Sequence, residues 1–250
     1  MTTTQTDRAP APFDAPPVPP QAAYLAELEE ACRPEPLEDH YLWPRSEVGH
    51  DMQDKRRRLF GITDYDVQRR RSRPAQLIRA LRRLIKQGCI PAAFSIADVA
   101  CGDGVILWQI RRAWPEAQCY GIDCLKDRIG VHAQVQAAGV ALRRIFIQRL
   151  FAQAPPRAFD VVMMLNTYRG WDAADLRPHE RDLPARADAW FAQSARYLFV
   201  NATPPQAAAF RRRGLSVQRI GGGDQGSITV CVSSEILPRS PWWSSWGLAR

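Results

Sequence analysis

Two acidic residues and two glycines lie within one short stretch of the chain, and together they could hold a nucleotide-like ligand. Residues 95–104 read SIADVACGDG, so Asp98 ends an apolar run, and Gly102 and Gly104 follow it. Glycines let a backbone approach a ligand closely, and the first turn of a helix offers unpaired N–H groups. Because loops with two such glycines are common, this stretch alone is a weak signal.

A second acidic residue strengthens the prediction of a nucleotide-like ligand. Residues 117–123 read AQCYGID, a short apolar strand that ends in Asp123. This acid comes roughly 20 residues after the glycine turn, where nucleotide-binding α/β folds place a carboxylate on the ribose hydroxyls. A nicotinamide-binding turn would have a third glycine near Leu107, and this chain has none there. The pair of motifs therefore favours a nucleotide-like ligand other than a dinucleotide.

At these residues the chain resembles the class I S-adenosylmethionine-dependent methyltransferases. The run DVACGDG at 98–104 is similar to their first motif, and GID at 121–123 to their second. The resemblance implies S-adenosylmethionine as cofactor and an α/β, Rossmann-like fold. In that fold a sheet of parallel strands ends in an antiparallel hairpin and is flanked by helices.

The resemblance also implies which residues touch the cofactor. Gly102 and Gly104 would lie against its methionine and ribose parts, Asp123 would bind both ribose hydroxyls, and Cys124 would border the adenine. The family usually has glycine in place of Ala100, where alanine costs little if its φ is negative. The predicted cofactor-binding residues are Asp98, Ala100, Cys101, Gly102, Gly104, Asp123, Cys124, Gln148, Arg149, Leu150, Leu165 and Asn166.

The apolar pattern predicts strands and helices in the order that this fold requires. Strands are expected at 96–99, 117–123, 142–148, 159–165 and 197–201, followed by an antiparallel pair at 215–220 and 227–233. Helices are expected at 21–32, 74–86, 105–114, 125–138, 188–196 and 206–213. The ends of the first, second and fourth strands then bring the predicted site together at one edge of the sheet.

The stretch NTYRGW at 166–171 follows the fourth strand and carries the first candidates for catalysis. Methyl transfer from a sulfonium needs in-line placement and exclusion of water, and a hydroxyl acceptor also needs a base. The predicted catalytic residues are Asn166, Tyr168 and His179, with Asp172 and Glu180 as further candidates for the base. Because an Asn-Pro-Pro-Tyr-like run is missing, methylation of base or glutamine nitrogens is disfavoured.

Positive charge is concentrated in one segment. The chain carries a net charge of +8. Residues 53–86 hold twelve Lys or Arg and three Asp, a net +9, and the rest, with 22 basic and 23 acidic residues, has −1. The basic clusters at 55–58 and 69–71 suggest an anionic partner, whereas Arg79, Arg82 and Arg83 are expected on a solvated helix face.

Three functions remain open from the sequence. The favoured one is oxygen methylation of a small molecule or sugar-containing metabolite, preferably an anionic one. The second is an RNA methyltransferase that uses the basic segment on phosphates. The third is a non-catalytic, methyltransferase-like binding module, which Ala100 and a missing acid after the third strand support weakly.

Composition and sequence pattern also predict how the chain is organised and in which compartment the protein works. The expected organisation is a disordered tail (1–20), a helical and basic accessory segment (21–73), a methyltransferase domain (74–235) and a tryptophan-rich tail (236–250). The sequence has no run of 18 apolar residues, and the first residues, without a basic start or an apolar stretch, are not expected to act as a secretory signal. The six cysteines and four histidines lack metal-ligand spacing, which is typical of a reduced, cytoplasmic protein.

Overall fold

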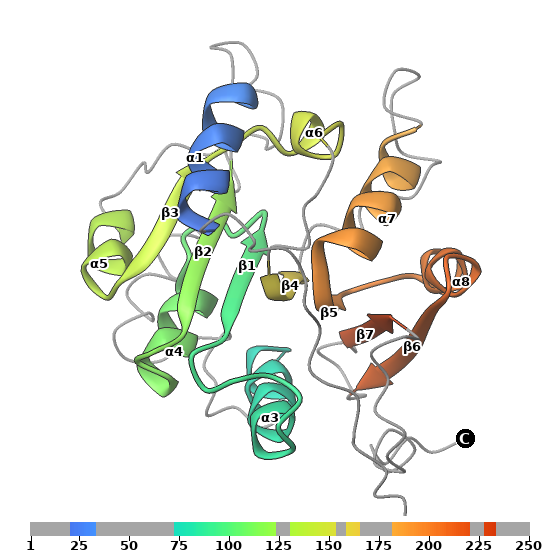
Figure 1. Cartoon of the computed structure of the whole chain (residues 1–250), viewed down its shortest axis with the longest axis horizontal. Helices are drawn as coiled ribbons and strands as arrows, with labels where there is room; N and C mark the ends of the chain where they lie inside the picture. The colour runs from blue at the N-terminus through green and yellow to red at the C-terminus, as the bar shows by residue number, and fades with distance from the viewer. Residues whose placement is uncertain are drawn as a thin grey trace, which may run out of the picture.

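The computed structural model describes residues 21–33, 73–123, 131–153, 159–165, 182–220 and 228–233. Within them a 7-stranded sheet has the order β3-β2-β1-β4-β5-β7-β6 (Figure 1). Strands β1 to β5 are parallel, and β7 runs antiparallel between β5 and β6. The predicted sheet with its antiparallel hairpin is confirmed. The strands are β1 (Ser95–Val99), β2 (Gln118–Asp123), β3 (Val140–Arg144), β4 (Phe159–Met164), β5 (Ala195–Val200), β6 (Leu215–Ile220) and β7 (Ile228–Ser233).

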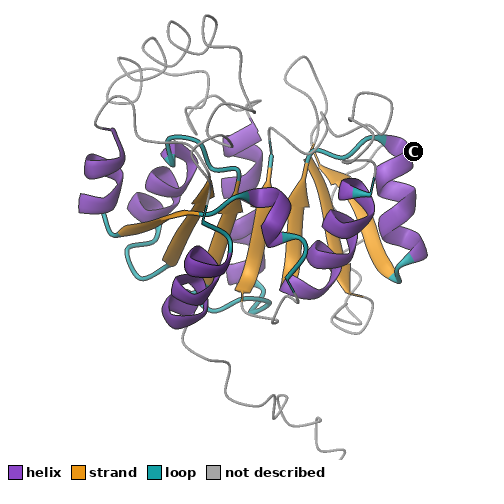
Figure 2. Cartoon of the chain, turned by 90° about the horizontal axis from the view of Figure 1, so that it is seen from above, coloured by secondary structure: helices purple, strands orange, loops and turns teal. Residues whose placement is uncertain are grey.

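Helices cover both faces of the sheet (Figure 2). Because side chains alternate along a strand, Ile96 and Val161 face a core with α3, α4 and α5, whereas Ala97 and Val162 face one with α1, α6, α7 and α8. The described helices are α1 (Gln21–Ala31), α3 (Arg73–Lys86), α4 (Val105–Ala113), α5 (Val131–Ala137), α6 (Ile147–Leu150), α7 (Leu183–Ser194) and α8 (Pro204–Arg212).

The sequence of α3 explains why this segment forms a helix that packs on the sheet. Leu77, Leu81 and Leu84 recur at helical spacing and are all fully buried. Pro74 stands in the first turn, where its missing N–H leaves no hydrogen bond unmade. The predicted helix at 74–86 is therefore confirmed, with its apolar face on the sheet and its arginines on the other side.

The third strand differs from the prediction. It was expected at 142–148 but ends at Arg144. The N–H of Ile145 makes the last hydrogen bond to β2, at the carbonyl of Asp123 (2.9 Å), and Phe146 then turns away from the sheet. Phe146 N–H instead donates to the carbonyl of Cys32, at the end of α1 (2.7 Å). The apolar run after the strand is buried against helices rather than paired in the sheet, and Gln148 lies in α6.

Helix α1 packs against this end of the sheet. Tyr24, Leu25 and Leu28 are buried in the core that α1 shares with α6 and α7. The carboxylate of Glu29 accepts a hydrogen bond from the Arg144 main chain (3.2 Å) and pairs with the neighbouring arginine side chain (3.1 Å). The predictions for 1–20 and 236–250 lie outside the described residues. Among those described, no helix has the length and apolar character needed to cross a membrane.

Candidate functional site

The predicted ligand-binding residues meet at the carboxyl edge of the sheet. Asp98 lies beside Gly121 of β2 and Met163 of β4, and Asp123 ends β2. The main-chain N–H of Gly102 donates to Oδ2 of Asp123 at 2.8 Å. The two sequence motifs, 21 residues apart, are therefore in direct contact.

The turn between β1 and α4 holds an unusual backbone. Ala100, Gly102 and Gly104 have φ values of 62, 58 and 76°, all in the left-handed region. The N–H groups of Ala100 and Cys101 both donate to the Ile122 carbonyl (2.8 and 3.2 Å), which fixes this conformation. Among the described residues, Ala100 is the one non-glycine with positive φ. The negative φ at which alanine would cost little is therefore not found at Ala100, and a left-handed alanine costs about 1–2 kcal/mol.

The glycines at this edge serve different purposes. A Cβ on Gly104 would lie 3.0 Å from Val135 Cγ1 and 3.2 Å from Leu142 Cδ2, so packing as well as φ requires glycine there. A Cβ on Gly121 would lie 2.4 Å from the same Leu142 atom. A Cβ on Gly102 would meet nothing within 4 Å. Gly102 therefore has open space on the side where a Cβ would stand.

Buried acids surround this turn. Asp98 is 4% exposed and Asp123 is 8% exposed. Burial raises the pKa of Asp98 well above its ordinary value, and the negative charges of Asp123 and Asp103 raise it further. The same burial and the same three carboxylates raise the pKa of the Cys101 thiol, which makes it a poor nucleophile. The site therefore favours a positively charged ligand group.

Two further residues shape the turn. Asp103 Oδ1 accepts a hydrogen bond from Val105 N–H (3.2 Å) at the start of α4. On α5, His132 Nε2 lies 3.1 Å from the Gly102 carbonyl oxygen. The sequence prediction missed His132 because it stands 30 residues from that glycine in no motif.

The other predicted residues are placed as follows. Gln148, Arg149 and Leu150 lie in α6, and Arg149 Nη1 donates to the Arg33 carbonyl (2.9 Å), so its guanidinium faces the end of α1. Leu150 is fully buried and Leu165, after β4, is 2% exposed. Their contacts with a cofactor stay predictions. The predicted residues Cys124, Asn166, Tyr168 and His179 lie outside the described residues.

Comparison with known proteins gives structural neighbours. No family model matches the chain, and no curated protein matches its sequence. The bifunctional kinase-methyltransferase WbdD superposes with a TM-score of 0.54 at 14% identity, over 70% of this chain and 42% of WbdD. The magnesium protoporphyrin IX methyltransferase ChlM of Synechocystis PCC 6803, solved with bound SAH, gives 0.51 at 14% identity, over 76% and 97%. The sugar N-methyltransferase KedS8 of Streptoalloteichus sp. ATCC 53650 gives 0.50 at 16%, over 77% and 95%.

These superpositions define the class of structure. The strand order, the antiparallel β7 and the glycine turn after β1 are those of a Rossmann-like methyltransferase sheet. The chain has the class I methyltransferase fold, and it spans less than half the length of WbdD.

Proposed function

We propose that this protein transfers a methyl group from S-adenosylmethionine to a hydroxyl oxygen of a small molecule. The fold supports the reaction class, because fold neighbours that act on a porphyrin and on a sugar are methyltransferases by name. The observation that carries the proposal is the group of buried acids beside the open backbone of Gly102.

The residues at the carboxyl edge fit this cofactor. S-adenosylmethionine carries two positive charges, on its sulfonium and its ammonium group. Asp98 is 4% exposed, and no described residue forms a hydrogen bond or an ion pair with its carboxyl group. A buried carboxylate is costly unless it is paired, so a cationic ligand group would supply the missing partner. When bound, the cofactor supplies an electrophilic methyl group.

Each residue of the edge has a proposed task. Asp98 would face the positive end of the cofactor, and Asp123, already fixed by the Gly102 N–H, would bind the ribose hydroxyls. Gly102 would let the methionine part lie on bare backbone. Residues 148–150 would flank the adenine. A charge-assisted, bidentate contact such as that of Asp123 contributes on the order of 2–3 kcal/mol.

For the acceptor we propose a sugar-bearing or other small, anionic metabolite. The run at 166–171 lacks the Asn-Pro-Pro-Tyr pattern of enzymes that methylate base nitrogens. Asn166 would lie beside the reacting groups, and Tyr168 or His179 would remove the hydroxyl proton. The basic part of 21–73 would shape this pocket in front of the 74–235 domain.

We place the reaction in the cytoplasm. The cysteines of the described part of the chain, Cys32, Cys89, Cys101, Cys119 and Cys231, are free thiols. This agrees with a reducing compartment.

Two measurements test the proposal in sequence. Calorimetry with S-adenosylhomocysteine asks whether the cofactor binds, and release of S-adenosylhomocysteine in the presence of sugar and phenol acceptors asks whether a methyl group is transferred. We expect saturable binding and turnover with at least one hydroxyl acceptor. Binding without turnover on any acceptor would favour the binding module, and turnover on RNA alone would favour the RNA methyltransferase.

A further inference from the structure

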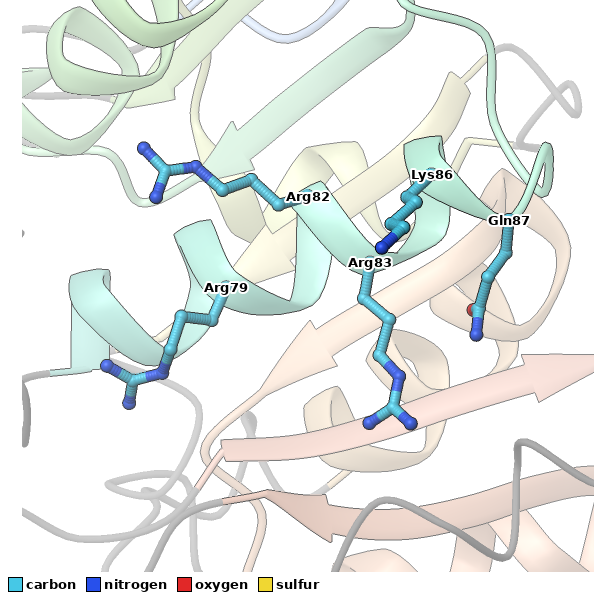
Figure 3. A pocket seen from close by; sticks show the side chains of 5 residues that line it. All are labelled: Arg79, Arg82, Arg83, Lys86 and Gln87. Atoms are coloured by element: carbon cyan, nitrogen blue, oxygen red, sulfur yellow. The ribbon is translucent and has the colours of Figure 1, made fainter.

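A basic surface lies at the end of the sheet opposite the candidate site. Helix α3 leads into the amino end of β1, and Figure 1 shows α3 and α6 at opposite ends of the sheet. Arg79, Arg82, Arg83, Lys86 and Gln87 line an open hollow of about 640 Å³ on its outer side (Figure 3). We call these five residues the α3 basic surface. They take no part in the function proposed above.

Nothing in the neighbouring sequence opposes this charge. From Arg73 to Ala97 the chain contains no Asp or Glu. Arg79, Arg82 and Lys86 are exposed and form no ion pair with any described residue. Like charges three and four residues apart destabilise a helix by about 0.2–0.5 kcal/mol per pair. A polyanion bound across them would remove this repulsion.

The arrangement of the side chains favours an extended partner over a single small anion. Arg79 and Lys86 are seven residues apart, which is about 10 Å along a helix. In Figure 3 the side chains of Arg79, Arg82 and Arg83 spread in different directions instead of converging on one point. Charges spread over two turns fit anions spaced along a chain.

The residue types of the α3 basic surface favour one class of partner over the others. A protein interface relies on buried aromatic or aliphatic anchors, and firm membrane binding adds apolar side chains that insert into lipid to the attraction between basic residues and anionic headgroups. The described residues that line the hollow all have charged or amide side chains. Contacts to a phosphate backbone need cations alone, and arginine, which makes up three of the five residues, binds phosphate with two N–H groups.

We propose that the α3 basic surface binds the phosphate backbone of a nucleic acid without sequence preference. Because none of the described residues that line the hollow is aromatic, we expect binding to depend on charge and on salt rather than on base stacking. This binding is separate from the choice of methyl acceptor, since it uses the opposite end of the sheet.

The test uses the full chain and a fluorescent single-stranded poly(U) RNA of about 12 nucleotides, followed by anisotropy from about 50 to 300 mM salt. The variant is Arg79→Gln with Arg82→Gln. Its matched control is Arg211→Gln with Arg212→Gln, two exposed arginines of α8 that change the net charge equally. Thermal melting checks that both variants remain folded.

We expect the α3 variant to lose about 25-fold in affinity at 0.1 M salt and its log–log salt slope to fall by about 1.4, the counterion release of two contacts on a single strand. The α8 control should stay within about twofold of the wild type. Equal losses in both variants would show that only net charge matters and would overturn the proposal. So would absence of RNA binding at low salt, or equal competition by poly-L-glutamate at the same charge concentration.

Discussion

The carboxyl edge of the sheet and the outer face of α3 both concentrate like charges, but one buries them and the other leaves them in water. At the edge, Asp98 and Asp123 are at most 8% exposed, and the pKa of Asp98 is raised well above its ordinary value. On α3, Arg79 and Arg82 are exposed. Because water screens charge strongly and a protein interior does not, the acids need a partner far more than the arginines do.

The two regions also differ in backbone conformation. Ala100, Gly102 and Gly104 all have positive φ, whereas α3 is a regular amphipathic helix. Glycine adopts positive φ at no steric cost, so the strain is at Ala100; such strain persists where the surrounding structure holds it, and it is common at ligand sites. We infer that the edge is a rigid, specific site, whereas α3 offers a regular surface for binding that depends mainly on charge.

The largest effect is expected at Asp123. Asp123→Ala removes the proposed ribose contact and the acceptor for the Gly102 N–H. Affinity for S-adenosylhomocysteine should fall about 30- to 150-fold, which is 2–3 kcal/mol. Calorimetry measures this affinity, with Asp182→Ala, at the exposed residue just before α7, as the control. If the two variants bind equally well, Asp123 does not hold the ribose.

The next effect is on stability at Gly121. A Cβ there would lie 2.4 Å from Leu142 Cδ2 and 2.8 Å from Cys101 Sγ, so Gly121→Ala overpacks the edge. We expect the free energy of unfolding to fall by about 1–3 kcal/mol. Gly88→Ala, with φ of 68° and open space around it, provides a control for backbone strain alone. A loss at Gly121 clearly below about 1 kcal/mol would contradict the tight packing described.

We expect Asp98 to lower the stability of the ligand-free protein while it supports binding of the cofactor. Its pKa is raised in the folded protein, so the folded state holds a proton that the unfolded state loses, and stability falls as pH rises above the unfolded value of about 3.9. Asp98→Asn removes this penalty. In urea unfolding the variant should be more stable than the wild type at pH 8, with the gap closing toward pH 4. A gap that does not change with pH would contradict the raised pKa.

The smallest effect is expected at Ala100. Ala100→Gly relieves a left-handed alanine, φ 62°, but adds flexibility to the unfolded chain. These terms partly cancel, so we expect a gain of about 0.5 kcal/mol in thermal melting. A clear loss of stability would show that the methyl group contributes packing that outweighs its strain.

Local patterns predicted most of the sheet and the turn. Each strand apart from β3 begins and ends within about two residues of its expected range, because an apolar run bounded by turn residues is a local signal. The third strand was misplaced because the apolar residues at 145–147 are buried by α1 and α6, and the bond from Phe146 N–H to the Cys32 carbonyl spans more than a hundred residues. No local pattern encodes such a contact.

The site was predicted in part for the same reason. Asp98, Gly102 and Asp123 stand in motifs, whereas His132 reaches the Gly102 carbonyl from a helix with no motif of its own. The arginines of α3 were expected on a solvated face, and Arg79 and Arg82 are exposed. That these side chains share one hollow is a property of the folded surface and not of their spacing.

The most direct test is the proton balance of S-adenosylmethionine binding, measured by calorimetry between pH 5 and 7 in two buffers of different ionisation enthalpy. A cation beside Asp98 lowers the raised pKa of that acid, so we expect binding to release a proton and affinity to increase with pH. The Asp98→Asn variant should bind S-adenosylmethionine more weakly and release fewer protons on binding. If the wild type does not bind S-adenosylmethionine, the proposed cofactor is wrong; if both proteins release the same number of protons, Asp98 does not face the positive charge of the cofactor.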